Sequence, residues 1–185
     1  MAESIVGRLN AGGTDRARLF FALWPDDRAR DALANLARDA HAECGGRQTK
    51  PEKIHLTLVF LGDVGCDRIA RLKALASAVR GSPFELELDT LGYWRHNRIL
   101  WAGARRSPPA LTDLVAALCA GLASEGAYEE DRPYVPHITL LRNARCAPGK
   151  RAACCVAWHV TEFALVESVR RGGADLYDTI GKWPL

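Results

Sequence analysis

A duplicated arrangement constrains this chain most: an apolar strand, a helix and a second strand that carries the pattern His-x-Thr-Leu. The pattern occurs at residues 55–58 and again at 137–140. The apolar run before each motif begins at Leu19 and at Ile99, which is 36 residues before the first motif histidine and 38 before the second. This repetition predicts two similar halves, each placing one histidine and one threonine on a strand.

Each motif has a polar face, because side chains two residues apart on a strand point the same way. His55 is thereby expected beside Thr57, and His137 beside Thr139. Imidazole has an ordinary pKa of about 6.5, so one ring can accept a proton while another donates one. If both strands face one site, the four side chains favour acid–base cleavage of a phosphodiester such as a 2′,3′-cyclic phosphate. The threonine hydroxyls would donate to its non-bridging oxygens. The residues alone do not say which histidine is the acid.

The periodicity of apolar residues predicts an α+β fold in which strands outnumber helices. A helix capped by Asp26 is expected to end at Gly45-Gly46, and a hairpin turn is expected at Gly172-Gly173. Further helices are expected over residues 69–79 and 109–122. Strands are expected over residues 19–24, 54–61, 84–89, 99–102, 136–142, 156–166 and 176–183.

Composition suits one domain with a sizeable core. The 185 residues are 48% hydrophobic and 25% charged, with a formal net charge of +3 that suits an anionic substrate without requiring one. Residues 1–17 lack periodicity and are expected to form a flexible tail before a single domain over 18–185. The sequence shows neither a secretory signal nor an apolar run long enough to span a membrane, which predicts a cytoplasmic protein.

The six cysteines are expected to be reduced thiols rather than a disulfide framework, as is usual in the cytoplasm. A weaker alternative is a zinc site with the following candidate ligands: Cys146, Cys154, Cys155 and His159. Only Cys155 and His159 are spaced like a ligand pair, and no second pair accompanies them. We therefore expect neither a metal nor another cofactor.

The two motifs and their flanking blocks resemble the 2H phosphoesterases, and most closely the bacterial RNA 2′,3′-cyclic phosphodiesterases, also called 2′–5′ RNA ligases. The resemblance rests on residues 18–22, 51–62, 132–142 and 183–185. It implies a bilobed fold in which two pseudo-symmetric antiparallel sheets face a central cleft, with helices on the outer faces. It also implies hydrolysis of RNA 2′,3′-cyclic ends to 2′-phosphates. His55 would be the proton donor and His137 the proton acceptor.

Five further residues are weaker candidates for contacts with the substrate. The resemblance favours a phosphate-binding role for Arg142, although an odd offset from Thr139 points it to the opposite strand face unless a bulge intervenes. A surface ion pair is the alternative for Arg142, and for Arg132 and Lys53. Phe21 and Tyr134 are candidates for base stacking, with core packing as the alternative.

Two alternative functions remain open at this level. The chain could be a non-catalytic module that binds RNA ends or nucleotides, or a phosphodiesterase of small cyclic nucleotides. The expected partners are RNA with 2′,3′-cyclic phosphate ends, or nucleotides, and the expected state is a monomer without membrane contact. Reversible 2′–5′ ligation of RNA is an additional activity that the resemblance implies.

Overall fold

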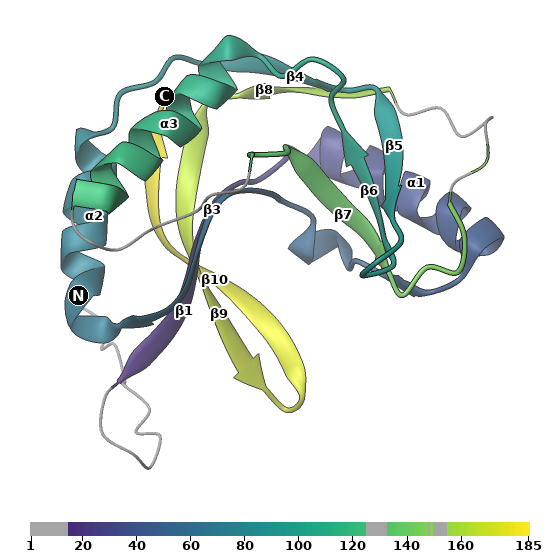
Figure 1. Cartoon of the computed structure of the whole chain (residues 1–185), viewed down its shortest axis with the longest axis horizontal. Coiled ribbons are helices and arrows are strands. Elements are labelled where there is room, and N and C mark those ends of the chain that lie inside the picture. The colour runs from purple at the N-terminus through teal and green to yellow at the C-terminus, as the bar shows by residue number, and fades with distance from the viewer. Residues whose placement is uncertain (1–14, 125–132, 148, 150–154) are drawn as a thin grey trace.

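The computed structural model describes residues 15–124, 133–147, 149 and 155–185 (Figure 1). The elements run in the following order: β1 (Arg16–Leu23), α1 (Asp27–Cys44), β2 (Arg47–Gln48), η1 (Pro51–Lys53), β3 (Leu56–Gly65), η2 (Cys66–Arg68), α2 (Ile69–Ala78), β4 (Phe84–Leu88), β5 (Thr90–Trp94), β6 (Ile99–Gly103), α3 (Pro109–Ser124), β7 (His137–Arg142), β8 (Val156–Val160), β9 (Glu162–Arg171) and β10 (Ala174–Pro184). The α+β prediction is confirmed.

The two similar halves are joined into one sheet. Strands β10-β9-β1-β3-β7-β6-β5 pair in that order, β2 pairs with β7, and β4 and β8 form a separate two-stranded sheet. β1 and β3 pair antiparallel in the first half, as β6 and β7 do in the second. The halves meet where Leu56 of β3 pairs with Ile138 of β7, so the two motif strands are neighbours.

The large sheet has two chemically different faces. Leu19, Phe21 and Leu56 point into the main core together with buried residues of all three α-helices, and we call this the helix face. Phe20 and Ala22 alternate with those residues and form a separate apolar cluster with Ala164 and Val166. The motif histidines are next to the buried Leu56 and Ile138 in sequence, so they lie on this second face, which we call the histidine face.

Most of the expected elements are present, with three differences. Arg16 and Ala17 belong to β1 rather than to the tail, because Ala17 is buried in the main core; residues 1–14 lie outside the described range. The strand expected over residues 156–166 is divided into β8 and β9, which pair with β4 and β1 respectively. The short strands β2 and β5 and the 3-10 helices η1 and η2 were not expected. The side chain of Asp26 caps α1 by accepting from the amide of Ala29 at 2.7 Å, as the sequence predicts.

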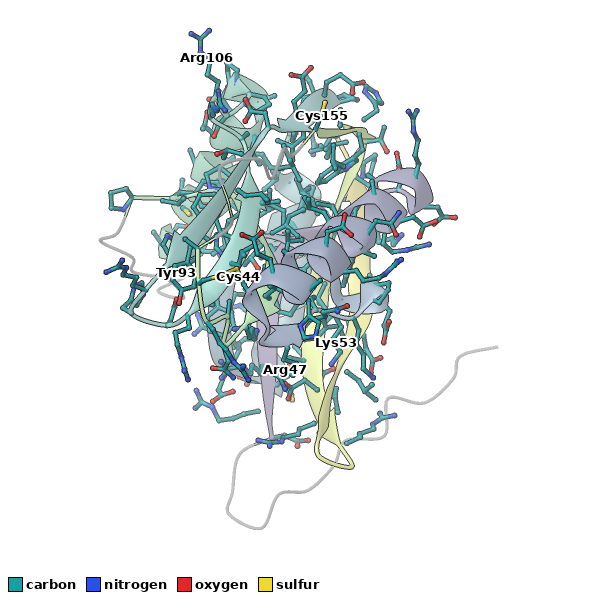
Figure 2. The ribbon with its side chains drawn as sticks, turned by 90° about the vertical axis from the view of Figure 1, so that its right-hand side faces the viewer. Cys44, Arg47, Lys53, Tyr93, Arg106 and Cys155 are labelled. Carbon is teal, nitrogen blue, oxygen red and sulfur yellow. A yellow bond between two sulfur atoms is a disulfide. The ribbon has the colours of Figure 1, made fainter. Side chains whose placement is uncertain are left out.

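The expectation of reduced cysteines is wrong for one pair. Cys44 at the end of α1 and Cys146 after β7 form a disulfide, with their Cα atoms 5.1 Å apart (Figure 2). The zinc alternative with these four ligands also fails, because the Cys146 sulfur is bonded to Cys44. Cys154 lies outside the described residues, which contain no group of three metal-binding side chains. No helix in the described part of the chain is long and apolar enough to cross a membrane.

Phe21 is a core residue, so the core-packing alternative holds and its candidate stacking role is wrong. Its side chain has 0% exposure and contacts the rings of Phe163 and Trp183, with centroids 6.2 and 6.3 Å away. We expect Phe21→Ala to lower the free energy of unfolding by about 3–5 kcal/mol, because it leaves a cavity in the core. Leu176→Ala is the control: Leu176 is 40% exposed, and its substitution should change stability by no more than about 0.5 kcal/mol. Urea unfolding of both variants measures the difference, and equal effects would contradict the assignment.

Candidate active site

The pairing of the two motif strands brings four polar side chains together. In an antiparallel ladder the residue before one partner faces the residue after the other. Because Leu56 pairs with Ile138, His55 stands opposite Thr139, and Thr57 stands opposite His137. The four side chains are partly exposed, whereas Leu56 and Ile138 have no exposed surface. The expected clustering of two imidazoles and two hydroxyls is therefore present on the histidine face.

Two hydrogen bonds fix the orientation and tautomer of His55. Its Nδ1 lies 2.7 Å from the carbonyl oxygen of Lys53, and its Nε2 lies 3.1 Å from Oγ1 of Thr57. A carbonyl can only accept, so Nδ1 carries the proton and donates it to Lys53. The neutral ring then has a lone pair on Nε2, to which the Thr57 hydroxyl donates. Nε2 is the nitrogen directed at the cluster.

His137 is held in the same way. Its Nδ1 lies 2.9 Å from the carbonyl oxygen of Val135, two residues earlier, just as His55 contacts Lys53. Nδ1–H therefore donates to this carbonyl, and Nε2 of the neutral ring keeps a lone pair. The two halves thus present equivalent nitrogens. A lone pair held in this way is what a general base requires.

Burial keeps both imidazoles neutral. It lowers the pKa of His55 to about 4, an effect that the positive charges of Arg142 and His137 reinforce and that the Lys53 hydrogen bond opposes. Burial also lowers the pKa of His137, reinforced by Arg142 and opposed by the Val135 hydrogen bond. Desolvation disfavours the charged ring in each case. Both histidines are therefore mostly uncharged at pH 7 before an anion binds.

Aromatic rings that sequence reasoning does not place at the site surround both histidines. Phe20, Tyr177 and Trp24 contact His55, with ring centroids 5.0, 5.3 and 5.5 Å away. Alternation along β1 puts Phe20 and Trp24 on the same face as Ala22, but β1 is apolar on both faces, so the sequence does not show that this face carries the site. Tyr177 comes from β10, which is remote in sequence.

A second aromatic group stands beside the other histidine. The ring of Trp94 is 4.5 Å from that of His137 and that of Trp101 is 6.5 Å away. Trp101 lies close over the backbone of Gly92 and Gly103, where a Cβ atom would stand within 2.7 Å of the indole or nearer. The sequence alone favours packing roles for these tryptophans. Their contacts with His137 show that they also line the site.

A bulge in β7 places Arg142 on the histidine face. Thr139 pairs with Trp101 and Leu141 pairs with Leu100, so Leu140 is an extra residue in β7. Leu140 and Leu141 are both buried, and the next residue, Arg142, therefore returns to the face that carries Thr139. Its charge contributes to lowering the pKa of both motif histidines. Arg142 therefore shares the histidine face with both motif histidines, near enough for its charge to affect their pKa values.

The remaining candidates have other contacts. The hydroxyl of Tyr134 donates to the carbonyl of Thr57 at 3.1 Å, which ties the segment before one motif to the other motif. Burial raises the pKa of Tyr134, so this hydroxyl remains a donor. Lys53 donates to the backbone carbonyl of Asp175, and its Nζ lies 5.5 Å from the ring centre of Tyr177. Arg132 lies outside the described residues.

Comparisons with known proteins place the chain in a family. The family described as LigT-like phosphoesterase matches residues 23–101. The chain is 34% identical to the RNA 2′,3′-cyclic phosphodiesterase of Escherichia coli over 91% of its length and 96% of that protein. It is 30% identical to the Thermus thermophilus protein of the same name, over 91% and 90% of the two chains.

The structural similarity covers the same extent. A crystal structure of E. coli LigT in complex with 3′-AMP aligns with a TM-score of 0.81 at 33% identity, over 92% of this chain and 98% of that one. Similarity therefore extends over both halves of the chain. The chain belongs to the RNA 2′,3′-cyclic phosphodiesterase family of LigT-like phosphoesterases.

Proposed function

We propose that this protein hydrolyses the 2′,3′-cyclic phosphate at RNA ends to a 2′-phosphomonoester. The main support is the antiparallel pairing of Leu56 with Ile138, which gathers His55, Thr57, His137 and Thr139 on one face. Relatives that share about a third of its residues are named for this activity. The proposal includes a cytoplasmic monomer whose partners are RNA ends.

His137 acts as the base and His55 as the acid in this proposal, in the order that the family resemblance implies. Nε2 of His137 takes a proton from water as the water oxygen bonds to phosphorus. The bond from phosphorus to the 3′ oxygen breaks, and protonated Nε2 of His55 gives its proton to that oxygen. The two rings exchange protonation states, and solvent restores them. If an RNA 5′-hydroxyl attacks phosphorus in place of water, the phosphate stays bonded to the 2′ oxygen. The same groups would then support 2′–5′ ligation.

Arg142 and the two threonines hold the phosphate. A guanidinium presents several donors and keeps its charge at any working pH, which suits the non-bridging oxygens as negative charge develops on them. The hydroxyl of Thr57 donates to Nε2 of His55 in the neutral ring. Once Nε2 is protonated it can no longer accept, and this hydroxyl becomes available to the phosphate.

The low pKa of His55 predicts an acidic pH optimum for kcat/KM. With a pKa of about 4, about one His55 ring in a thousand is protonated at pH 7 in the free protein. The value of kcat/KM falls as pH rises above this pKa, because His55 loses the proton that it must donate. It also falls at low pH, because His137 becomes protonated and can no longer accept a proton. We expect a bell with its maximum below about pH 6.5, the ordinary histidine pKa.

Two observations check this profile. The substrate phosphate favours the charged ring, so the alkaline limb of kcat should lie at higher pH than that of kcat/KM. Arg142→Gln removes a positive charge that lowers both histidine pKa values, and should shift both limbs upward. Initial rates between about pH 4 and 9 would measure this, and a kcat/KM maximum above about pH 7.5 would contradict the assigned protonation states.

Analysis of end groups tests the function itself. RNA with a 2′,3′-cyclic phosphate end is incubated with the protein, and the ends are identified by chromatography after nuclease digestion. We expect a 2′-phosphate from the wild type and an unchanged cyclic end from the His55→Ala, His137→Ala double variant. Retention of cyclic ends by a wild type that still binds the RNA would instead favour a binding module. Turnover of cyclic mononucleotides alone would favour the small-nucleotide alternative.

A further inference from the structure

Phe60 on β3 is a large aromatic side chain that remains exposed on the histidine face. It is 45% exposed, although its strand neighbours Leu58 and Val59 are buried. Ala22 pairs with Thr57 and Phe21 pairs with Val59, so Leu58 is an extra residue in β3. This bulge turns Phe60 back to the face that carries His55 and Thr57.

Phe60 occupies the position in the first half that Arg142 occupies in the second. The segments 55–60 and 137–142 both read histidine, apolar, threonine, leucine and apolar before the final residue. Both have a bulge at the leucine after the threonine. The pseudo-symmetry therefore places an aromatic ring on one side of the histidine pair and a guanidinium on the other. Since Arg142 faces the phosphate, the ring is positioned for a different part of the substrate.

A cation accompanies this ring. The guanidinium carbon of Arg18 on β1 lies 4.8 Å from the centre of the Phe60 ring. Nη1 of Arg18 also lies 4.0 Å from Oδ1 of the exposed Asp63, which is the limit for an ion pair. Arg16 donates to the backbone carbonyl of the same residue. An exposed aromatic ring with an arginine above it is a combination that stacks bases of single-stranded nucleic acid.

The ring and the active site form one continuous surface. Phe60 pairs across the ladder with Phe20, whose ring contacts His55 at 5.0 Å. Phe60 stands five positions after His55 in the chain, which is about 16 Å at about 3.3 Å per residue in a fully extended strand and less across the bulge. A phosphate between the motif histidines would therefore leave Phe60 within reach of the nucleotides that precede the RNA end. The Phe60 ring would be too far from this phosphate to contact it.

We propose that Phe60 and Arg18 form a subsite for single-stranded RNA upstream of the terminal cyclic phosphate. One base stacks on the Phe60–Arg18 pair, and the charge of Arg18 offsets a neighbouring backbone phosphate. The subsite rests on the proposed function of the histidine pair, and it makes an oligonucleotide a better substrate than a cyclic mononucleotide. Stacking on a ring is tolerant of sequence, so little base preference is expected.

Steady-state kinetics with two substrates tests the subsite. The wild type should show a kcat/KM for a trinucleotide with a 2′,3′-cyclic end about tenfold or more above that for 2′,3′-cyclic AMP. Phe60→Ala should remove most of this preference by lowering only the trinucleotide value. Phe60→Trp should keep it, because the ring can still stack. Arg18→Gln should lower it and weaken its dependence on salt.

The control is Leu176→Ala, which removes a similarly exposed apolar side chain from β10 and should change neither substrate. Equal kcat/KM for both substrates in the wild type would overturn the subsite. So would a Phe60→Ala variant that loses activity equally on both. If the wild type turns over neither substrate, the proposed function fails. Equilibrium binding of a 2′-phosphate trinucleotide to wild type and Phe60→Ala then tests the subsite separately, with equal affinities overturning it.

Discussion

Replacing His137 with alanine lowers kcat by about 10²- to 10⁴-fold, the usual contribution of a general base. The ring is the only partner that the mechanism gives to the proton of the attacking water, and its Nδ1 contact with the Val135 carbonyl leaves Nε2 ready to accept. His55→Ala should cost a similar factor, because the leaving 3′ oxygen then departs without a proton. Initial rates on RNA with a cyclic phosphate end measure both losses.

The double variant distinguishes a cooperating pair from two independent groups. If the rings act in one transition state, His55→Ala combined with His137→Ala should lose little more activity than either change alone. His159→Ala is the matched control, because His159 lies on the two-stranded sheet and pairs with Glu85. It should keep wild-type activity. Small losses that multiply in the double variant would contradict the mechanism.

Arg142→Ala has the second largest expected effect. Removing one preorganised donor to a transition-state oxyanion typically costs about 10²- to 10³-fold in kcat. Arg142 is suited to that position because the bulge at Leu140 returns it to the histidine face, where its charge acts on both imidazoles. Arg142→Lys should recover part of the loss, because it keeps the charge and loses the planar fork.

A control for this variant is available at the tip of the β9–β10 hairpin. Arg171 is exposed there beside Gly172 and Gly173. Arg171→Ala removes the same charge from the protein without touching the histidine face, and should leave kcat within about twofold. Comparable losses for both arginine variants would mean that net charge, rather than a contact with the phosphate, explains the effect of Arg142.

Alternation along the strands explains why so much of the site was predictable from sequence. Histidine and threonine two residues apart, with an apolar residue between them and leucine after them, can bury their apolar neighbours only if both polar side chains share the other face. The duplicated spacing predicted the equivalence of the two halves. The observed pairing of Leu56 with Ile138 adds what periodicity could not supply, because cross-strand register depends on residues 82 positions apart.

The errors have equally specific physical causes. β1 is apolar on both faces, so its sequence does not show which aromatic residue points to the site; the stacking prediction fell on Phe21, whereas Phe20 contacts His55. A bulge adds one residue without a change in composition, which is why the sequence leaves the orientation of Arg142 open. The disulfide joins cysteines that are 102 residues apart, and only the packing of α1 beside β7 brings them together.

A crystal structure of this protein with a bound 2′-phosphate mononucleotide tests the convergence of the two histidines most directly. Nε2 of His55 and Nε2 of His137 should each lie within about 3.2 Å of oxygens of the same phosphate, on opposite sides of the phosphorus atom. A phosphate bound by one ring alone, or bound away from both, would contradict the proposed chemistry.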